Sequence, residues 1–277
     1  MISKVSITEE IRNFLKEKQF SEWKKLLEIY IQKINDQSLN QKERNFWVIK
    51  LYSQYLQFIE IFSINIFVIT ENRLFENLFM GNVELKAKID KQLGSNEYID
   101  YLVKKWIFGI KNRETINHLE EKENFYKRLI KEVVKDYVND QDLLNAYKHG
   151  FRLESKGYIN VKMVIDNNPG KTFPIDNYNS SIHYWSKGKK EEKHIIFENR
   201  LLFNWERIEQ KFILIDNILE NILKVFFSND KKVNLTHLYI DDPIEFNKHF
   251  GTMRMKTPIF TKSETNNKQV SRDIVIE

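Results

Sequence analysis

Apolar residues lie on almost every side of one long stretch of the chain, from about Gln41 to Leu78. Their spacing of three and four residues is that of a helix, and a helix that is apolar on so many sides lies inside a bundle. Such a helix needs other helices around it. The apolar positions in this stretch are Phe46, Ile49, Leu51, Tyr55, Phe58, Ile59, Phe62, Ile66 and Ile69.

The rest of residues 1–150 also favours helix. One apolar face recurs between Ser21 and Asp36, and a further helix is expected from about Arg113 to Tyr137, followed by a short one that Asp140 caps. The 277 residues include only 8 Gly and 4 Pro, which helices tolerate poorly and which barrels and sandwiches need at their turns. We therefore predict a mainly α protein, a multi-helix bundle with a small antiparallel β insertion.

The sequence pattern changes at Phe151, after which segments rich in β-branched and aromatic residues follow. We expect a β-hairpin insertion at 151–198. A returning long helix and a short strand are expected to pack on the bundle at 199–262, and a loose tail at 263–277. The expected strands are Tyr158–Ile165, Ser181–Trp185, His194–Phe197 and Val233–Ile240, and the returning helix spans about Leu202–Phe227.

Composition limits the location of the protein. The chain has no cysteine, which excludes disulfides and thiolate zinc sites and fits a reducing compartment. The most apolar stretch, Phe58–Ile69, contains Glu60 and is about half the roughly 20 residues that a membrane span needs. The net charge of +5 permits contact with nucleic acid without arguing for it. We expect a cytoplasmic protein that does not bind a membrane.

One segment, residues 145–150, combines residues that suggest chemistry. The four-residue spacing of Asn145 and His149 places both side chains on one face of a helix. A histidine beside an amide can act as a general base, and Lys148 can bind a phosphate. An ordinary helix end, with His and Lys in the last turn and Gly150 after them, explains the same residues and stays open as the alternative.

The segment resembles the motif of the HEPN family of helical bundles, which consists of an Arg, a polar residue that is often Asn, three variable residues and a His. Asn145 and His149 match the last two conserved positions, and Leu144 stands where the family has its Arg. In HEPN ribonucleases the His is the acid/base and the Arg binds the phosphate. The resemblance implies Asn145 and His149 as catalytic residues, with Lys148 or Arg152 in place of the Arg at the phosphate.

Two other patterns argue against further sites. Four histidines near the β segment form no metal-binding spacing, so we expect no metal and no cofactor. Gly170-Lys171-Thr172 suggests a phosphate loop, but Ile165 stands where that loop needs its first Gly, and the segment is predicted to be a hairpin turn. The four histidines are His183, His194, His237 and His249.

Aromatic residues and lysines alternate in the β insertion. Such a mixture is typical of a surface that binds single-stranded RNA, although packing of a small sheet on the bundle explains it better. The residues are Tyr158, Phe173, Tyr178, Tyr184 and Trp185, with Lys162, Lys171 and Lys187.

Two functional hypotheses follow. The first is an HEPN-like protein of a bacterial defence or toxin-type system that binds RNA or nucleotide. It would cleave RNA without a metal if the site at His149 is complete. The second is a non-catalytic helical module that forms a homodimer through an apolar helix face. The first is the leading hypothesis, and the Leu at position 144, the lack of any complete catalytic set and the aromatic-rich helices motivate the second as the alternative.

Overall fold

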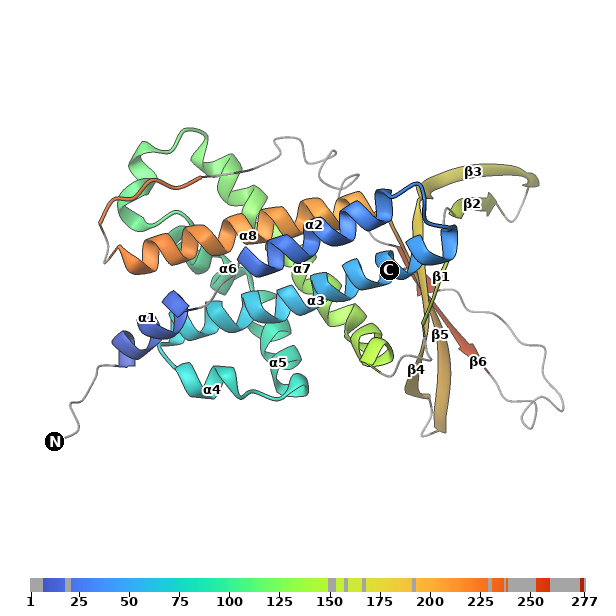
Figure 1. The fold of residues 1–277 in the computed structure, drawn as a ribbon, viewed down its shortest axis with the longest axis horizontal. Coiled ribbons are helices and arrows are strands. Elements are labelled where there is room, and N and C mark those ends of the chain that lie inside the picture. The colour runs from blue at the N-terminus through green and yellow to red at the C-terminus, as the bar shows by residue number, and fades with distance from the viewer. Residues whose placement is uncertain are drawn as a thin grey trace. The chain divides into compact units, whose positions relative to one another are not determined.

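The described part of the chain is mainly helical, with antiparallel strands as the minor part, and this confirms the predicted fold class (Figure 1). None of the helices in it is long and apolar enough to cross a membrane. The computed structural model describes residues 7–17, 21–148, 153–156, 159–165, 168–190, 193–228, 231–236, 238, 253–259 and 275–276.

The long helices follow the predicted apolar spacing. The helix predicted from Gln41 to Leu78 ends at Glu71, because Asn72 adopts a positive φ of 58°, a conformation that Asn tolerates better than most residues. The helices are α1 Ile7–Glu17, α2 Ser21–Asn35, α3 Gln41–Glu71, α4 Leu74–Leu78, α5 Asn82–Lys88, α6 Asn96–Leu102, α7 Leu119–Lys148 and α8 Trp205–Phe227. Short π- and 3₁₀-helical segments are η1 Ile89–Leu93, η2 Val103–Ile107 and η3 Ile110–Thr115.

Helix α7 is longer than the sequence predicted. We expected a helix that stops near Tyr137 and a second one capped by Asp140, but the helix runs without interruption to Lys148. The prediction was wrong because Asp140 is not a cap. Its carboxylate is buried and accepts hydrogen bonds from side chains distant in sequence, so it does not compete for the helix backbone.

The chain forms two compact units. The helical unit comprises residues 1–26, 55–139 and 209–250, and the mixed unit comprises residues 27–54, 140–208 and 251–277. Each unit therefore combines segments from both sides of residue 150.

The core of the helical unit forms where α3, α7 and α8 pack together. The ring of Phe58 stacks on that of Phe212, with centroids 4.2 Å apart. Beside them Asp136 accepts hydrogen bonds from Lys211 Nζ at 2.6 Å and from Tyr55 OH at 2.8 Å. All three of these polar side chains are buried, so they link the three helices inside the core.

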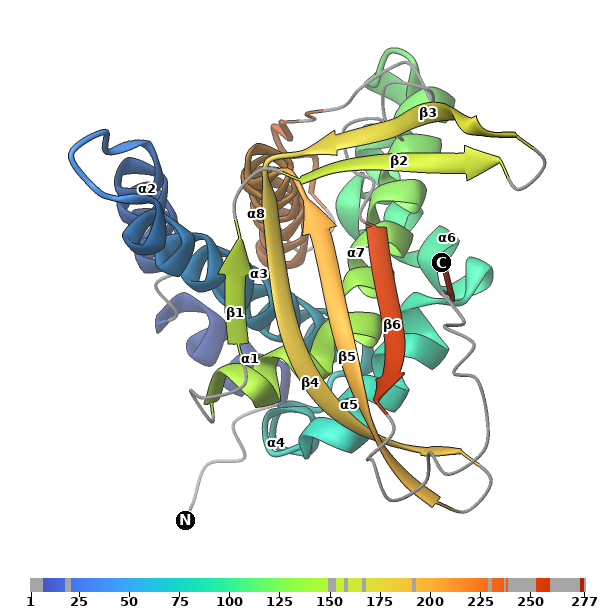
Figure 2. The same cartoon turned by 90° about the vertical axis from the view of Figure 1, so that its right-hand side faces the viewer.

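The mixed unit contains all the described strands, and its larger sheet has the order β1-β4-β5-β6-β7. Figure 2 shows β1, β4, β5 and β6 side by side. Strands β2 and β3 form a separate antiparallel pair. The strands are β1 Leu153–Lys156, β2 Ile159–Ile165, β3 Asn168–Tyr178, β4 Ser180–Lys190, β5 Lys193–Phe203, β6 Met253–Ile259 and β7 Val275–Ile276.

The sheet extends beyond the predicted insertion at 151–198. Strand β5 runs on to Phe203, and β6 comes from the segment after α8. The strand predicted at 233–240 is wrong for residues 233–236, which have no regular structure. Two residues of the tail predicted to be loose, Val275 and Ile276, pair with β6. Edge pairing of this kind depends on a partner far away in sequence, which local patterns do not reveal.

Candidate functional site

The predicted site residues lie at the end of α7, in the mixed unit. Asn145 and Lys148 belong to its last turn, where the structure describes the backbone but not these two side chains. His149 and Arg152 lie outside the described residues. The roles assigned to these four residues therefore stay predictions.

Leu144, which stands where HEPN proteins carry an Arg, is only 2% exposed. Leu143 and Ala146 on the same part of α7 are buried as well. The side chain at position 144 points into the protein, where it contributes to the core and is not available to a phosphate. The family's phosphate contact therefore has no counterpart at this position.

Tyr147, which lies between Asn145 and His149 in the sequence, belongs to a cluster that the sequence did not predict. Lys50 Nζ on α3 donates a hydrogen bond to Tyr147 OH and lies 5.0 Å from the centre of the Tyr147 ring. The same ammonium lies 5.3 Å from the centre of the Phe46 ring. No carboxylate of the described residues pairs with Lys50, so two aromatic rings hold its charge in place.

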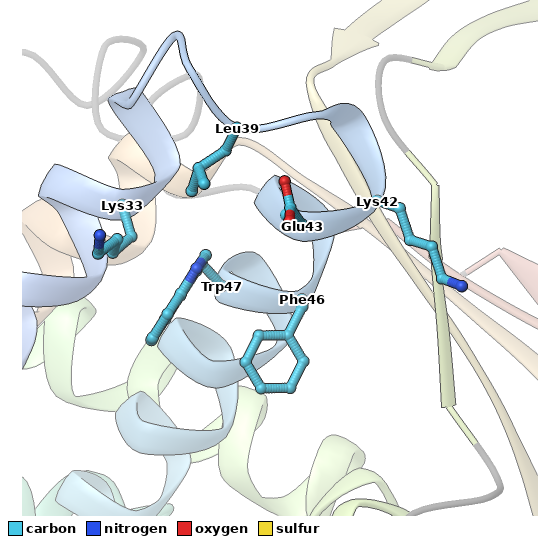
Figure 3. Close-up of a pocket in the computed structure, with 6 residues that line it drawn as sticks. All are labelled: Lys33, Leu39, Lys42, Glu43, Phe46 and Trp47. Atoms are coloured by element: carbon cyan, nitrogen blue, oxygen red, sulfur yellow. The ribbon is translucent and has the colours of Figure 1, made fainter.

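A hollow of about 340 Å³ adjoins this cluster, and Phe46 belongs to both (Figure 3). Trp47 lies beside Phe46, with ring centroids 5.4 Å apart and planes at 76°. In Figure 3 Lys42 points away from the Trp47 indole. The hollow is lined by Lys33, Leu39, Lys42, Glu43, Phe46 and Trp47.

Glu43, an acidic residue in this lining, has a structural role. Its carboxylate accepts a hydrogen bond from the Asn40 backbone at 2.9 Å, and its own backbone N–H donates to Asn40 Oδ1 at 3.0 Å. This reciprocal pair is a capping box that starts α3. Because Glu43 is committed to the helix end, the two lysines and the two aromatic rings set the chemical character of the hollow.

We call Lys33, Lys42, Phe46, Trp47, Lys50 and Tyr147 the aromatic–lysine surface. Phe46 is 49% exposed, although its spacing in the sequence suggested a core position. Tyr30 lies behind Trp47, with ring centroids 5.8 Å apart. Burial raises the pKa of Tyr30, although the charge of Lys50 acts in the opposite direction, so its hydroxyl stays protonated at neutral pH.

Asp140 anchors the end of α7 beside this surface. Arg254 of β6 donates to both of its oxygens, at 2.9 Å and 2.8 Å, and Tyr52 OH of α3 donates at 2.6 Å. The Tyr52 ring also contacts Phe203 of β5, with centroids 4.8 Å apart. This buried cluster ties α3, α7 and the sheet together and so places Tyr147 against Lys50.

The neighbouring Tyr184 is buried too. Burial raises its pKa well above the ordinary value, and the charges of Asp140 and Asp142 act in the same direction. Tyr184 therefore remains a neutral phenol in this cluster and contributes packing and a hydrogen-bonding group, with no charge of its own.

The described side chains of the other sequence candidates are not brought together into a site. Of the insertion aromatics, Tyr178 and Tyr184 are buried, as packing of the sheet requires, and Trp185 is 36% exposed. For Phe173 and the three lysines Lys162, Lys171 and Lys187 the structure describes only the backbone, and Tyr158 lies outside the described residues. The suggested phosphate loop Gly170-Lys171-Thr172 lies within β3.

Among the described residues the histidines form no metal centre either. His183 is buried, with Nδ1 3.8 Å from Glu198 Oε1. His194 lies in β5, where only its backbone is described, and His237 and His249 lie outside the described residues. Within the described part of the chain no group of three or more His, Asp or Glu could hold a metal ion.

The aromatic–lysine surface offers flat rings for stacking and ammonium groups for anions, a combination that suits a nucleotide or a nucleic acid strand. A signal for it existed in the sequence, since Phe46 and Lys50 are four residues apart on one helix face. The sequence alone could not place Tyr147 in this surface, because Tyr147 is far from Phe46 and Lys50 along the chain. The chain matches no family model, and no curated protein and no solved structure matches it.

Proposed function

We propose that the protein binds single-stranded RNA through the aromatic–lysine surface. The observation that carries the proposal is Lys50, which has no carboxylate partner among the described residues and is held by the rings of Phe46 and Tyr147. Bases of single-stranded RNA stack on exposed aromatic rings, and its phosphates pair with lysines. The half-exposed ring of Phe46 can stack on a base, and the ammonium of Lys50 can pair with a phosphate.

The end of α7 belongs to the same proposal. Asn145 and Lys148 flank Tyr147 in the last turn of the helix, and His149 follows directly. The resemblance to HEPN proteins assigns acid/base chemistry to a His at this position. Because Leu144 is buried and supplies no phosphate contact, we propose binding as the primary function. Cleavage by His149 is the further step that the resemblance implies.

The binding test uses a fluorescently labelled single-stranded RNA of mixed sequence and measures fluorescence anisotropy. Phe46→Ala and Lys50→Gln are each expected to raise the Kd about tenfold, since one stacked base contributes about 1–3 kcal/mol. Ile196→Ala and Lys86→Gln serve as controls, because Ile196 has nearly the same exposure as Phe46 and both lie outside the surface. Equal affinity of all variants, or no binding by the unmodified chain, would overturn the proposal.

Cleavage is tested separately with total RNA and no added metal. If His149 is the acid/base, His149→Ala loses cleavage but retains most of the binding, because the aromatic–lysine surface is unchanged. Equal cleavage by the two proteins would remove His149 from the assignment. Absence of cleavage by both would leave a binding protein without catalysis.

A second function, homodimer formation, is favoured by an exposed apolar ridge in the helical unit. Phe79 and Val83 are 81% and 85% exposed, and the rings of Phe75 and Phe79 stack with planes at 9°. Large apolar side chains gathered in this way on a surface mark a contact with another molecule.

The charges around this ridge suit a second copy of the same chain. Residues 71–92 carry four basic and four acidic side chains, so the segment has no net charge to attract a nucleic acid or an anionic membrane. In a two-fold dimer the same surface meets itself, and mixed charges can then pair across the axis. The eight side chains are Arg73, Lys86, Lys88, Lys91, Glu71, Glu76, Glu84 and Asp90.

Light scattering during size-exclusion chromatography tests the dimer. The unmodified chain is expected at twice its mass of 33.5 kDa, and Phe79→Ser at the mass of the monomer. Ile196→Ser, which removes a similarly apolar exposed side chain elsewhere, should remain dimeric. A monomeric unmodified chain contradicts the dimer, and a dimeric Phe79→Ser contradicts the location of its interface.

A further inference from the structure

A second hollow, of about 360 Å³, lies in the helical unit between the turn at Gly109 and the end of α8. Three lysines line it, and no Asp or Glu is among the described residues that do so. Its lining comprises Lys105, Gly109, Ile110, Lys111, Asn112, Val225, Ser228 and Lys231. A concave surface with several ammonium groups and no carboxylate concentrates anions.

Two carboxylates on the neighbouring elements already have basic partners, and Glu114 of η3 is exposed and does not line the hollow. Asp100 of α6 pairs with Lys104 at 2.6 Å and also with Lys127. Glu220 of α8 pairs with Lys224 at 3.7 Å. These acids therefore do not neutralise the lysines of the hollow.

Lys105 is held in place by neutral side chains, with no counter-ion among the described residues. Its ammonium donates to Tyr101 OH at 3.2 Å and lies 5.1 Å from the centre of the Trp106 ring. Lys111 and Lys231 are exposed and form no ion pair within the described part of the chain. Among the described residues, one oriented ammonium and two exposed ones thus have no carboxylate partner at this place on the surface.

The floor of the hollow is rigid. Gly109 has a positive φ of 69°, and a Cβ there would lie 2.9 Å from Asn112 Nδ2 and 3.1 Å from Val225 Cγ2. Asn112 is buried, donates to Phe108 O at 3.0 Å and accepts from the Val233 N–H at 3.1 Å. The hydrogen-bonded Asn112 thus connects η3 to the segment after α8, so that the lysines are presented on a fixed frame.

The turn follows a π-helical segment, η2, in which Phe108 N–H bonds to Val103 O at 3.1 Å. Single π-helical turns are rare and occur frequently at functional sites. Ser228, at the far side of the hollow, uses its hydroxyl proton to bond Val225 O at 2.7 Å, so its oxygen presents no proton toward the hollow. The anion contacts therefore come from the lysines.

We propose that this hollow binds the diphosphate group of a small molecule. Three ammonium groups call for an anion with several charges, which a diphosphate provides and a single carboxylate does not. Ile110, which is 66% exposed at the rim, offers an apolar contact to the organic group attached to the diphosphate. The site lies in the helical unit and is independent of RNA binding by the aromatic–lysine surface.

Isothermal titration calorimetry of the full chain with sodium pyrophosphate tests the site. The double variant Lys111→Gln, Lys231→Gln is expected to weaken binding at least about tenfold, and binding by the unmodified chain should weaken as salt is added. The control Lys16→Gln, Lys135→Gln removes the same charge at exposed positions elsewhere in the helical unit and should bind as the unmodified chain does. Both pairs of substitutions lie on exposed or partly exposed positions, so folding is expected to persist.

Two further ligands define the class of molecule. Adenosine diphosphate should bind more tightly than pyrophosphate, and the difference should disappear in Ile110→Ser. Sulfate should bind much more weakly than either. No pyrophosphate binding, equal weakening by the control variant, or equal affinity for sulfate would overturn the proposal. Equal affinity for the two diphosphates would overturn the role of Ile110.

Discussion

Asp136 and Lys211 form an ion pair in which both side chains are completely buried. Removing charge from water is unfavourable, and the contact of 2.6 Å together with the hydroxyl of Tyr55 offsets that penalty. Such a pair tolerates the joint replacement of both partners better than the loss of one. It specifies how α7 and α8 align more than it adds to stability.

We therefore predict that Lys211→Met lowers the free energy of unfolding by about 3–5 kcal/mol, because it leaves the Asp136 carboxylate buried without its partner. The double variant Lys211→Met, Asp136→Leu should recover a large part of this loss. Urea unfolding followed by circular dichroism measures both. A double variant less stable than Lys211→Met would contradict this interpretation of the pair.

The pKa of Glu71 predicts how the stability of the protein depends on pH. Burial would raise its pKa, but hydrogen bonds from Lys88, Gln92 and Asn77 outweigh burial and hold the pKa below its usual value. A carboxyl whose pKa is lower in the folded than in the unfolded chain stabilises the folded state at pH values above its unfolded pKa. This stabilisation is lost as the pH falls through the folded pKa.

Glu71→Gln should thus reduce stability at neutral pH by about 1–2 kcal/mol, since it removes charge-assisted hydrogen bonds. The difference from the unmodified chain should shrink on acidification. Thermal unfolding from neutral to acid pH measures it, with the exposed Glu84→Gln as the control. A difference that grows as the pH falls would contradict the sign of the shift.

Among the helices, α3 and α8 were predictable because the positions that must be buried recur every three or four residues along one segment. The buried residues Phe212, Ile215, Leu219 and Ile222 follow that spacing in α8. The length of α7 was not predictable in this way. Whether Asp140 caps a helix or lies inside one depends on Arg254, more than a hundred residues later in the chain. Similarly, the helical spacing of the apolar residues around Phe46 did not show whether the Phe46 side chain is buried or exposed.

The orientation of α7 yields a test of the HEPN resemblance. Leu144→Arg would restore the family's Arg, but the side chain at this position is buried, so the guanidinium would lack both water and a partner. We predict a loss of about 3–5 kcal/mol in the free energy of unfolding, with no gain in RNA cleavage. The conservative Leu144→Met should cost less than about 1.5 kcal/mol. A stable Leu144→Arg protein with new ribonuclease activity would contradict the placement of this side chain.

Across the whole chain, each compact unit is assembled from three separate stretches of sequence. The helical periodicity and the run of strands after residue 150 were visible locally, but the grouping of segments was not, because it depends on contacts between distant parts of the chain. The aromatic–lysine surface shows the consequence. Its lysine Lys50 and its phenol Tyr147 come from α3 and α7, and only the fold of the mixed unit joins them.

The last stretch of the mixed unit leads to a prediction about truncation. Strand β6 covers the edge of β5 along seven paired positions and carries Arg254, whose guanidinium binds the buried Asp140. A chain that ends at residue 250 would expose that edge and leave the Asp140 carboxylate without this partner. We expect a loss of about 3–5 kcal/mol, which lowers the Tm by roughly 10 °C.

A chain that ends at residue 262 retains β6 and removes only the two residues of β7 from the described sheet, so its Tm should fall by a few degrees at most. Arg254→Met in the full chain separates the two contributions of β6, since it removes the ion pair but keeps the strand. Its Tm should lie between those of the two truncated chains. Equal Tm values for the chains ending at 250 and 262 would mean that β6 does not support the mixed unit, and the position of Tyr147 against Lys50 would then need another explanation.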